Sequence, residues 1–176
     1  MKTVTAILLI GTIGSLVLFA CVRKSAPTCN VRNELVESII AAKAKELNGQ
    51  EYCQFRRYQT LFDMDKDGNY DFIVLFTVEG IGGGGNNHYD FMSVFLSSRG
   101  WQPIITRTGG RGERDPIGVD FRDGKIILQT LVYLPSDAVC CPSGKGTLIY
   151  KLRGDNLELI SETPNHAEPT APADRR

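Results

Sequence analysis

The spacing of apolar residues differs between an early segment of the chain and the segments that follow it. From Val31 to Leu47 apolar residues recur every three or four positions, which is the spacing of one buried face of a helix. Asn30 can cap the start of this helix, and Asn48-Gly49 can end it. The pattern predicts an amphipathic helix whose stripe holds Val31, Leu35, Val36, Ile39, Ile40, Ala44 and Leu47.

The chain after this helix is a series of short runs rich in β-branched and aromatic residues, separated by turn residues. The connections are too short for crossovers, so neighbouring strands should pair antiparallel. The sequence predicts an α+β fold, with an N-terminal amphipathic helix packed on an antiparallel β-meander sheet. The predicted strands cover residues 52–62, 71–79, 88–98, 101–107, 117–122, 125–134, 146–152 and 156–161. The aromatic core candidates are Phe72, Phe76, Phe91, Phe95 and Trp101.

The first 21 residues resemble the export signal of bacterial lipoproteins. Lys2 precedes an uncharged stretch, and Leu18-Phe19-Ala20-Cys21 is similar to a lipobox. The resemblance implies cleavage before Cys21 and acylation of that residue, whose buried methylenes, worth ~0.8 kcal/mol each, would hold the protein to a membrane. Two alternatives stay open: an uncleaved transmembrane anchor, since Thr3 to Val22 is just long enough to span a bilayer, and an ordinary secretory signal.

This signal sets the predicted domain organisation and location. Residues 1–20 are the signal peptide, 21–28 a lipid-anchored tether, 29–161 a single α+β domain and 162–176 a disordered tail rich in Pro. We expect the domain in the bacterial cell envelope, in the periplasm or outside the cell. Val22 after Cys21 favours the outer membrane in a cell that has one.

The charge of the mature chain excludes one class of partner. Without Lys2, 19 Lys and Arg residues stand against 20 Asp and Glu residues. A near-neutral chain offers no electrostatic basis for binding nucleic acid. The expected partners are the membrane, through the lipid, and an envelope protein or a cell-wall component.

Four cysteines remain besides Cys21, and they allow three disulfide pairings. We favour Cys29 with Cys53 and Cys140 with Cys141. The first bond closes a loop and is expected to contribute ~3 kcal/mol. The second joins sequence neighbours, whose Cα atoms lie ~3.8 Å apart, closer than in most disulfides. Free thiols and cross-pairing stay open, and the C-x-x-C spacing of thiol oxidoreductases is absent.

The sharpest chemical motif is the acidic run from Asp63 to Asp71. Ca²⁺ takes roughly six to eight oxygen ligands, and oxygen-bearing residues at alternate positions around Gly68 can supply them. Position 12 of the loop is Val74 rather than the closing Glu of an EF-hand, and a strand follows instead of a helix. We therefore predict a strand-flanked variant of the calcium loop; the alternative is a tight turn held by side-chain hydrogen bonds. The candidate ligands are Asp63, Asp65, Asp67, Asn69 and Asp71.

Catalytic motifs are scarce. Residues 80–87 form a glycine-rich hairpin loop with no helix behind it to bind phosphate. Residues 109–115 read as a solvated charged turn, in which Arg111 and Arg114 could bind an anion. The two histidines are His88, at the start of a strand, and His166, in the predicted tail. A cysteine nucleophile with His88 as its base would need a contact that only the fold can provide.

The order of these motifs resembles a group of uncharacterised exported bacterial proteins. The resemblance rests on the Asp-rich turn, the glycine-rich hairpin, Asp123-Gly124 before a strand, and Asp137 shortly before Cys140-Cys141-Pro142. It covers about Leu61 to Leu159 and implies a small β-rich exported domain, with no activity attached. Cys29 and Cys53 depart from the pattern, which leaves the pairing of Cys140 with Cys141 open.

Two functions from different classes follow. The first is a lipid-anchored envelope protein whose β-rich domain binds a partner or has a structural role without catalysis, stabilised by Ca²⁺. The alternative is a redox-active protein or another enzyme that uses Cys140 and Cys141.

Overall fold

The computed structural model describes residues 33–53, 59–83 and 85–163. Within these ranges one α-helix precedes nine strands and two short 3₁₀ turns. The elements are α1 (Glu34–Glu46), β1 (Gln50–Glu51), β2 (Gln59–Phe62), β3 (Asp71–Glu79), η1 (Ile81–Gly83), β4 (His88–Phe95), η2 (Ser97–Arg99), β5 (Pro103–Gly110), β6 (Arg114–Arg122), β7 (Lys125–Val132), β8 (Gly144–Arg153) and β9 (Asn156–Thr163).

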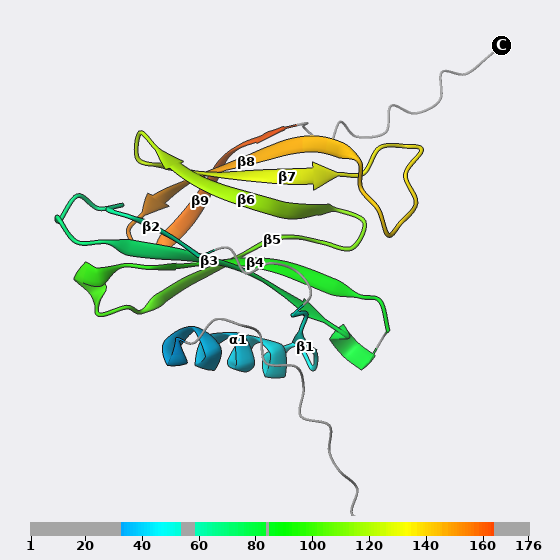
Figure 1. Cartoon of the computed structure of the whole chain (residues 1–176), viewed down its shortest axis with the longest axis horizontal. Coiled ribbons are helices and arrows are strands. Elements are labelled where there is room, and N and C mark those ends of the chain that lie inside the picture. The colour runs from blue at the N-terminus through cyan, green and yellow to red at the C-terminus, as the bar shows by residue number, and fades with distance from the viewer. Residues whose placement is uncertain (1–32, 54–58, 84, 164–176) are drawn as a thin grey trace, which may run out of the picture.

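All nine strands belong to one antiparallel sheet that is folded into two layers. The order along the sheet is β1-β3-β4-β5-β6-β7-β8-β9, and β2 also pairs with β3. Strands β1 to β5 form one layer and β6 to β9 the other, while α1 covers the outer face of the first layer (Figure 1). Strand β3 therefore lies in the middle of three layers.

The sheet bends at the connection between β5 and β6. Their only paired residues are Gly110 and Arg114, whereas β6 and β7 pair over their whole length. A Cβ on Gly109 would overlap the carbonyl oxygen of Arg114, and one on Gly110 would lie 2.6 Å from the carbonyl oxygen of His88. The two glycines thus permit a close approach of the backbones that a side chain would block.

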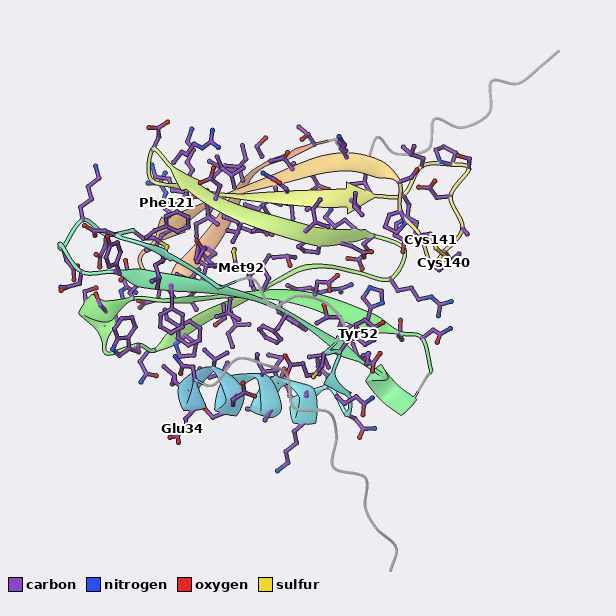
Figure 2. The ribbon with its side chains drawn as sticks, in the orientation of Figure 1. Glu34, Tyr52, Met92, Phe121, Cys140 and Cys141 are labelled. Carbon is purple, nitrogen blue, oxygen red and sulfur yellow. A yellow bond between two sulfur atoms is a disulfide. The ribbon has the colours of Figure 1, made fainter. Side chains whose placement is uncertain are left out.

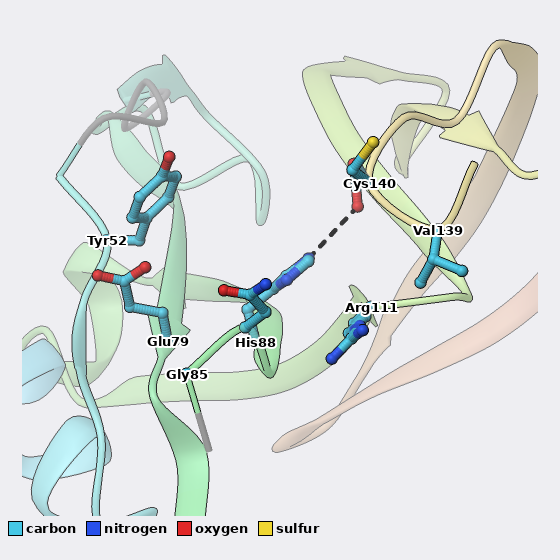
Figure 3. A pocket seen from close by; sticks show the side chains of 9 residues that line it. Tyr52, Glu79, Gly85, His88, Arg111, Val139 and Cys140 are labelled. Atoms are coloured by element: carbon cyan, nitrogen blue, oxygen red, sulfur yellow. Dashed lines mark ion pairs between the residues drawn. The ribbon is translucent and has the colours of Figure 1, made fainter. Parts of the chain in front are cut away.

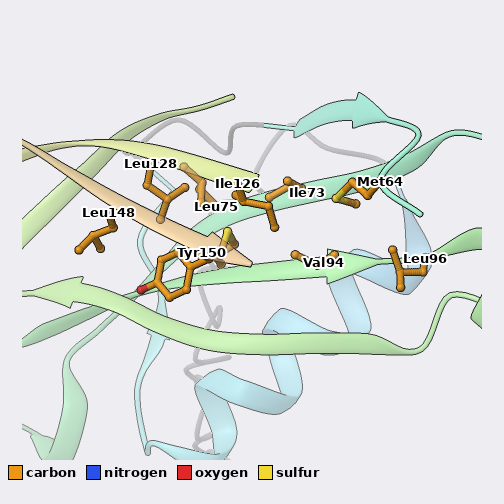
Figure 4. Close-up of a cluster of buried hydrophobic side chains, with 10 residues drawn as sticks. Met64, Ile73, Leu75, Val94, Leu96, Ile126, Leu128, Leu148 and Tyr150 are labelled. Atoms are coloured by element: carbon orange, nitrogen blue, oxygen red, sulfur yellow. The ribbon is translucent and has the colours of Figure 1, made fainter. Parts of the chain in front are cut away.

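Two hydrophobic clusters lie on opposite faces of β3. Ile73 and Leu75 pack with side chains of β4, β7 and β8 between the two sheet layers (Figure 4). The neighbouring residues Val74 and Phe76 face the other way and pack with Val36, Ile40 and Ala44 of α1. Because successive side chains of a strand point to opposite faces, covering both faces requires an unbroken apolar strand. Every residue of β3 from Asp71 to Val78 is buried.

The predicted single helix and antiparallel sheet are confirmed, but the helix differs from the predicted N-terminal amphipathic helix. It begins at Glu34, and Asn33 caps it by accepting hydrogen bonds from the backbone nitrogens of Leu35 (3.1 Å) and Val36 (3.4 Å). Only Val36, Ile40 and Ala44 are buried, so the buried stripe is one residue wide per turn. The flanking apolar residues are partly buried because the helix meets the sheet along one line of contact.

Most predicted strands occur, with shifted ends. Strand β9 continues to Thr163, two residues past the predicted end of the domain, and β6 begins at Arg114 inside the predicted solvated turn. The core assignment of Phe72, Phe76, Phe91 and Phe95 is confirmed, whereas that of Trp101 is wrong. Trp101 is 37% exposed and contacts the ring of Phe72 from the edge of the core, with ring centroids 5.4 Å apart.

The proposed signal, the acylation site Cys21 and the tether lie outside the described residues. Over residues 33–53, 59–83 and 85–163, no helix combines the length and the apolar character needed to cross a bilayer.

The coverage of both faces of β3 predicts that two adjacent substitutions will each destabilise the domain. Leu75→Ala should lower the free energy of unfolding by about 2 to 5 kcal/mol and Phe76→Ala by about 3 to 5 kcal/mol, since each leaves a cavity in a different cluster. Leu61→Ala is the control, because Leu61 is 56% exposed. Urea unfolding measures all three; a loss below about 1 kcal/mol at either buried position would contradict the three-layer packing.

Candidate functional site

The predicted calcium loop is the connection between β2 and β3, so strands flank it on both sides. Gly68 adopts a φ of 87°, which glycine tolerates and which makes the sharp turn. The backbone nitrogen of Gly68 donates a hydrogen bond to Asp63 (3.2 Å), and that of Met64 donates to Asp71 (2.8 Å). The loop closes on the carboxylates of its own first and last residues.

Three carboxylates converge inside this loop. One oxygen from each of Asp63, Asp65 and Asp71 lies within 4.8 Å of the others. Asp71 is fully buried at the start of β3, and its second oxygen accepts a hydrogen bond from the backbone nitrogen of Ser97 (2.8 Å). Asp65 also accepts a hydrogen bond from the hydroxyl of Ser98. The loop is therefore fastened to η2, which follows β4.

Asp67, the fourth predicted carboxylate ligand, lies outside this group, and the role of Asn69 as a ligand stays a prediction. Asp67 is exposed and accepts hydrogen bonds from the backbone nitrogen of Asn69 (2.7 Å) and from the hydroxyl of Ser97 (3.3 Å). The bond from the Asn69 backbone lowers the pKa of Asp67 most strongly. Hydrogen bonds of the predicted tight turn are thus present together with the convergence of acidic oxygens.

A second group of metal-binding side chains consists of His88, Asp90 and Asp115. His88 and Asp90 lie two positions apart on β4, so their side chains are on the same face, and Asp115 comes from β6. The Nε2 atom of His88 is 3.5 Å from Oδ1 of Asp115 and 3.9 Å from Oδ2 of Asp90. The bend between β5 and β6 brings these side chains together at one end of the space between the sheet layers.

The charges of this group are poorly neutralised. Burial raises the pKa of Asp90 to about 6, against the effect of a hydrogen bond that Asp90 accepts from the hydroxyl of Thr77. The adjacent Asp115 carboxylate raises the pKa of His88, while burial acts in the opposite direction. Buried Asp90 Oδ2 and Asp115 Oδ1 accept no hydrogen bond in the described structure.

This group opens into a pocket of about 410 Å³ (Figure 3). Tyr52 and Glu79 lie on one side of His88, and Val139 and Cys140 lie on the other. The dashed line in the figure is the pairing of His88 with Asp115. Arg111, from the β5–β6 turn, adds a positive charge to the pocket lining.

Cys140 reaches this pocket from the loop between β7 and β8, where it forms a disulfide with Cys141 (Figure 2). Asp137 holds the loop by accepting hydrogen bonds from the backbone nitrogens of Leu134 and Ser143, both at 2.8 Å. These hydrogen bonds lower the pKa of Asp137, and the bond from Leu134 has the largest effect. Both cysteines are exposed. Cys29 lies outside the described residues, so its pairing with Cys53 stays a prediction.

Two members of the His88 group were missed by the sequence analysis. Asp90 gave a usable signal, because an acidic residue there occupies the strand face that continues as Met92 and Val94, which are both buried. Asp115 gave none: residues 109–115 looked like a solvated turn, yet Arg114 is 4% exposed and Asp115 is 8% exposed. Their burial depends on the bend, which no local pattern reveals.

We compared the chain with protein-family models, with curated proteins and with solved structures, and none of these comparisons finds a match.

Proposed function

We propose that this chain is a lipid-anchored protein of the bacterial cell envelope, whose β-rich domain has a non-catalytic binding or structural role and is stabilised by Ca²⁺. The observation that carries the calcium proposal is the convergence of Asp63, Asp65 and Asp71 in the β2–β3 loop. The anchor rests on the sequence alone, through Cys21 and the uncharged stretch before it.

Electrostatics favour a bound cation in this loop. Three carboxylates whose oxygens lie within 4.8 Å of one another repel unless water, protons or a cation offset their charge. One oxygen of Asp63 is also buried and accepts no hydrogen bond from the described residues. A cation among the three carboxylates would supply the missing partner and remove the repulsion.

The type of ligand selects Ca²⁺ among the common cations. The converging atoms are all carboxylate oxygens, which hard cations prefer, and the group has no nitrogen or sulfur ligand. Ca²⁺ accepts irregular geometry and roughly six to eight oxygens, so backbone carbonyls and water can complete its shell. Mg²⁺ requires a near-ideal octahedron, which a loop of alternating carboxylates does not supply.

The position of the loop favours a stabilising role for this ion. Asp65 and Asp71 already contact Ser98 and Ser97, which follow β4, while Asp63 ends the β2 side of the hairpin. An ion held there would fasten the β2–β3 hairpin to the β4–β5 connection. An envelope protein or a cell-wall component would then bind a rigid domain held at the membrane by its lipid.

Calcium should bind to and stabilise the isolated mature protein. We expect one Ca²⁺ per chain with a Kd on the order of 10⁻⁴ to 10⁻³ M, typical of extracellular calcium modules. At about 100 times the Kd, mass action adds roughly 2.7 kcal/mol and raises the melting temperature by about 5 to 10 °C. Asp65→Asn should abolish this shift, because it removes one converging carboxylate. Calorimetric titration and thermal unfolding provide the measurement.

Two matched variants control this experiment. Asp123→Asn changes an exposed carboxylate in the β6–β7 turn and should leave the calcium response unchanged. Asp67→Asn tests the ligand set, since Asp67 lies outside the converging group; its effect should be smaller than that of Asp65→Asn. A wild-type protein that takes up no Ca²⁺, or an equal response from Asp65→Asn, would end the proposal.

A second candidate function is thiol–disulfide exchange at Cys140 and Cys141. It is favoured by one observation: this disulfide is exposed and borders the same pocket as His88. In the exchange, a thiolate of an external dithiol attacks one sulfur, the S–S bond breaks, and a mixed disulfide forms. The second thiol of the reductant then closes its own disulfide. Two electrons pass to the protein, which gains two protons as two cysteine thiols.

The redox candidate predicts two new thiols per native chain after treatment with a mild dithiol, with unchanged secondary structure. Thiol counting and circular dichroism measure both quantities on one sample. The double variant Cys140→Ser, Cys141→Ser should yield no new thiols under the same conditions. Reduction that occurs only together with unfolding would eliminate the redox candidate.

A further inference from the structure

His88, Asp90 and Asp115 bring one imidazole nitrogen and two carboxylate oxygens within 4.8 Å of one another, and His88 and Asp115 line the pocket. We propose that these three side chains bind a divalent transition-metal ion of the Zn²⁺ class, with a coordination position open to the pocket. This site is separate from the calcium loop and involves different strands. It does not depend on the proposed calcium site.

The proposal rests on buried carboxylate oxygens that accept no hydrogen bond. Asp90 is 6% exposed and Asp115 8% exposed, and Asp90 Oδ2 and Asp115 Oδ1 accept no hydrogen bond from the described part of the chain. A buried carboxylate oxygen that accepts no hydrogen bond is unfavourable. With a neutral imidazole, the two carboxylates carry two negative charges, which one divalent cation neutralises. The same ion would coordinate both oxygens.

The spacing of the three atoms suits such an ion. Bonds of ~2.0 to 2.2 Å from Zn²⁺ to nitrogen and oxygen place neighbouring ligand atoms ~3.3 to 3.5 Å apart in a tetrahedral site. The observed separations from His88 Nε2 are 3.5 Å to Asp115 Oδ1 and 3.9 Å to Asp90 Oδ2. Small rotations of the side chains would therefore complete the coordination without movement of the strands.

The surrounding structure holds two of the ligands in place. The hydroxyl of Thr77, on β3 directly opposite Asp90, donates a hydrogen bond to Asp90 Oδ1 and leaves Oδ2 directed at His88. Such an outer hydrogen bond orients a metal-binding carboxylate. The backbone nitrogen of Arg111 donates to the carbonyl oxygen of His88 (3.2 Å), which ties the β5–β6 turn to the start of β4.

The ligand set and its position indicate the class of metal. Imidazole with carboxylates suits zinc, iron, cobalt or manganese better than Ca²⁺, which prefers oxygen alone. Three protein ligands leave a tetrahedral ion one position for water or a ligand. His88 and Asp115 line the pocket, so that position would face a cavity that also contains Arg111. An anionic ligand could then bind the metal and pair with Arg111.

The test is a calorimetric titration with Zn²⁺ of the chelator-treated mature protein in excess Ca²⁺. We expect one Zn²⁺ per chain. His88→Gln and Asp115→Asn should each weaken binding by at least about 100-fold, because loss of an outer partner alone weakens metal binding roughly 10- to 100-fold. Thr77→Val, which removes only the orienting hydrogen bond, should weaken it by about 10-fold.

Three controls separate this site from other zinc ligands. His166→Gln changes the only other histidine of the chain and should leave Zn²⁺ binding unchanged. The double variant Cys140→Ser, Cys141→Ser should also bind normally, which excludes binding by thiols. Asp65→Asn should bind Zn²⁺ normally although it is expected to lose Ca²⁺, so failure of one proposal is distinguishable from failure of the other.

A readout on the wild-type protein guards against variants that fail to fold. Co²⁺ added to the wild-type protein should shift the imidazole NMR signals of His88 and leave those of His166 in place. The proposal is overturned if natively folded wild-type protein binds no Zn²⁺, if folded His88→Gln binds it as tightly as the wild type, or if Co²⁺ leaves the His88 signals unmoved.

Discussion

The bend between β5 and β6 is the constraint on which the rest of this structure depends. An antiparallel sheet of this length can cover its own apolar face by folding over, and here it does so where Gly109 and Gly110 of β5 let the backbones of β6 and β4 approach β5 closely. Folding over gives β3 a second covered face, since α1 already covers the first. The bend therefore determines where the larger hydrophobic cluster forms.

The same bend accounts for the buried polar residues at the end of that cluster. Arg114 and Asp115 follow the turn directly and are carried between the layers, where Arg114 pairs with Glu162 of β9. Asp115 meets His88 and Asp90, which lie on the face of β4 that continues as Met92 and Val94. Acidic groups kept buried without full neutralisation lower stability, and such arrangements are concentrated at functional sites.

The two proposed cation sites differ in the chemistry of their ligands. The β2–β3 loop offers oxygen atoms from residues that are close in the sequence. Most hydrogen bonds of this turn join residues of the loop to one another. The His88 group adds a nitrogen and draws its ligands from β4 and β6, so it exists only in the folded sheet. The first arrangement suits a hard ion and the second a transition metal.

These differences also explain how much the sequence could predict. The unbroken apolar run within residues 71–79 and the acidic spacing of residues 63–71 are local, and both the strand and the convergence of Asp63, Asp65 and Asp71 follow from them. The pattern allows a helix start at Asn30 as well as at Asn33, because both residues can cap a helix. The aromatic ring of Trp101 suggests burial, while its position at a turn with a φ of 66° leaves it at the edge of the core. The burial of Asp115 beside His88 depends on a contact between strands that are far apart in the sequence, and composition and spacing do not encode such a contact.

The most direct test of the role of the bend is the stability of Gly109→Ala, measured by urea unfolding with Gly118→Ala as the matched control. The new methyl group of Gly109→Ala would lie against the backbone of Arg114. That of Gly118→Ala would have the end of the Gln129 side chain as its nearest neighbour, 3.3 Å away. We expect Gly109→Ala to lower the free energy of unfolding by about 1 to 3 kcal/mol, the usual effect of overpacking, and Gly118→Ala to change it much less. Equal stability of Gly109→Ala and the wild type would contradict this role of the bend.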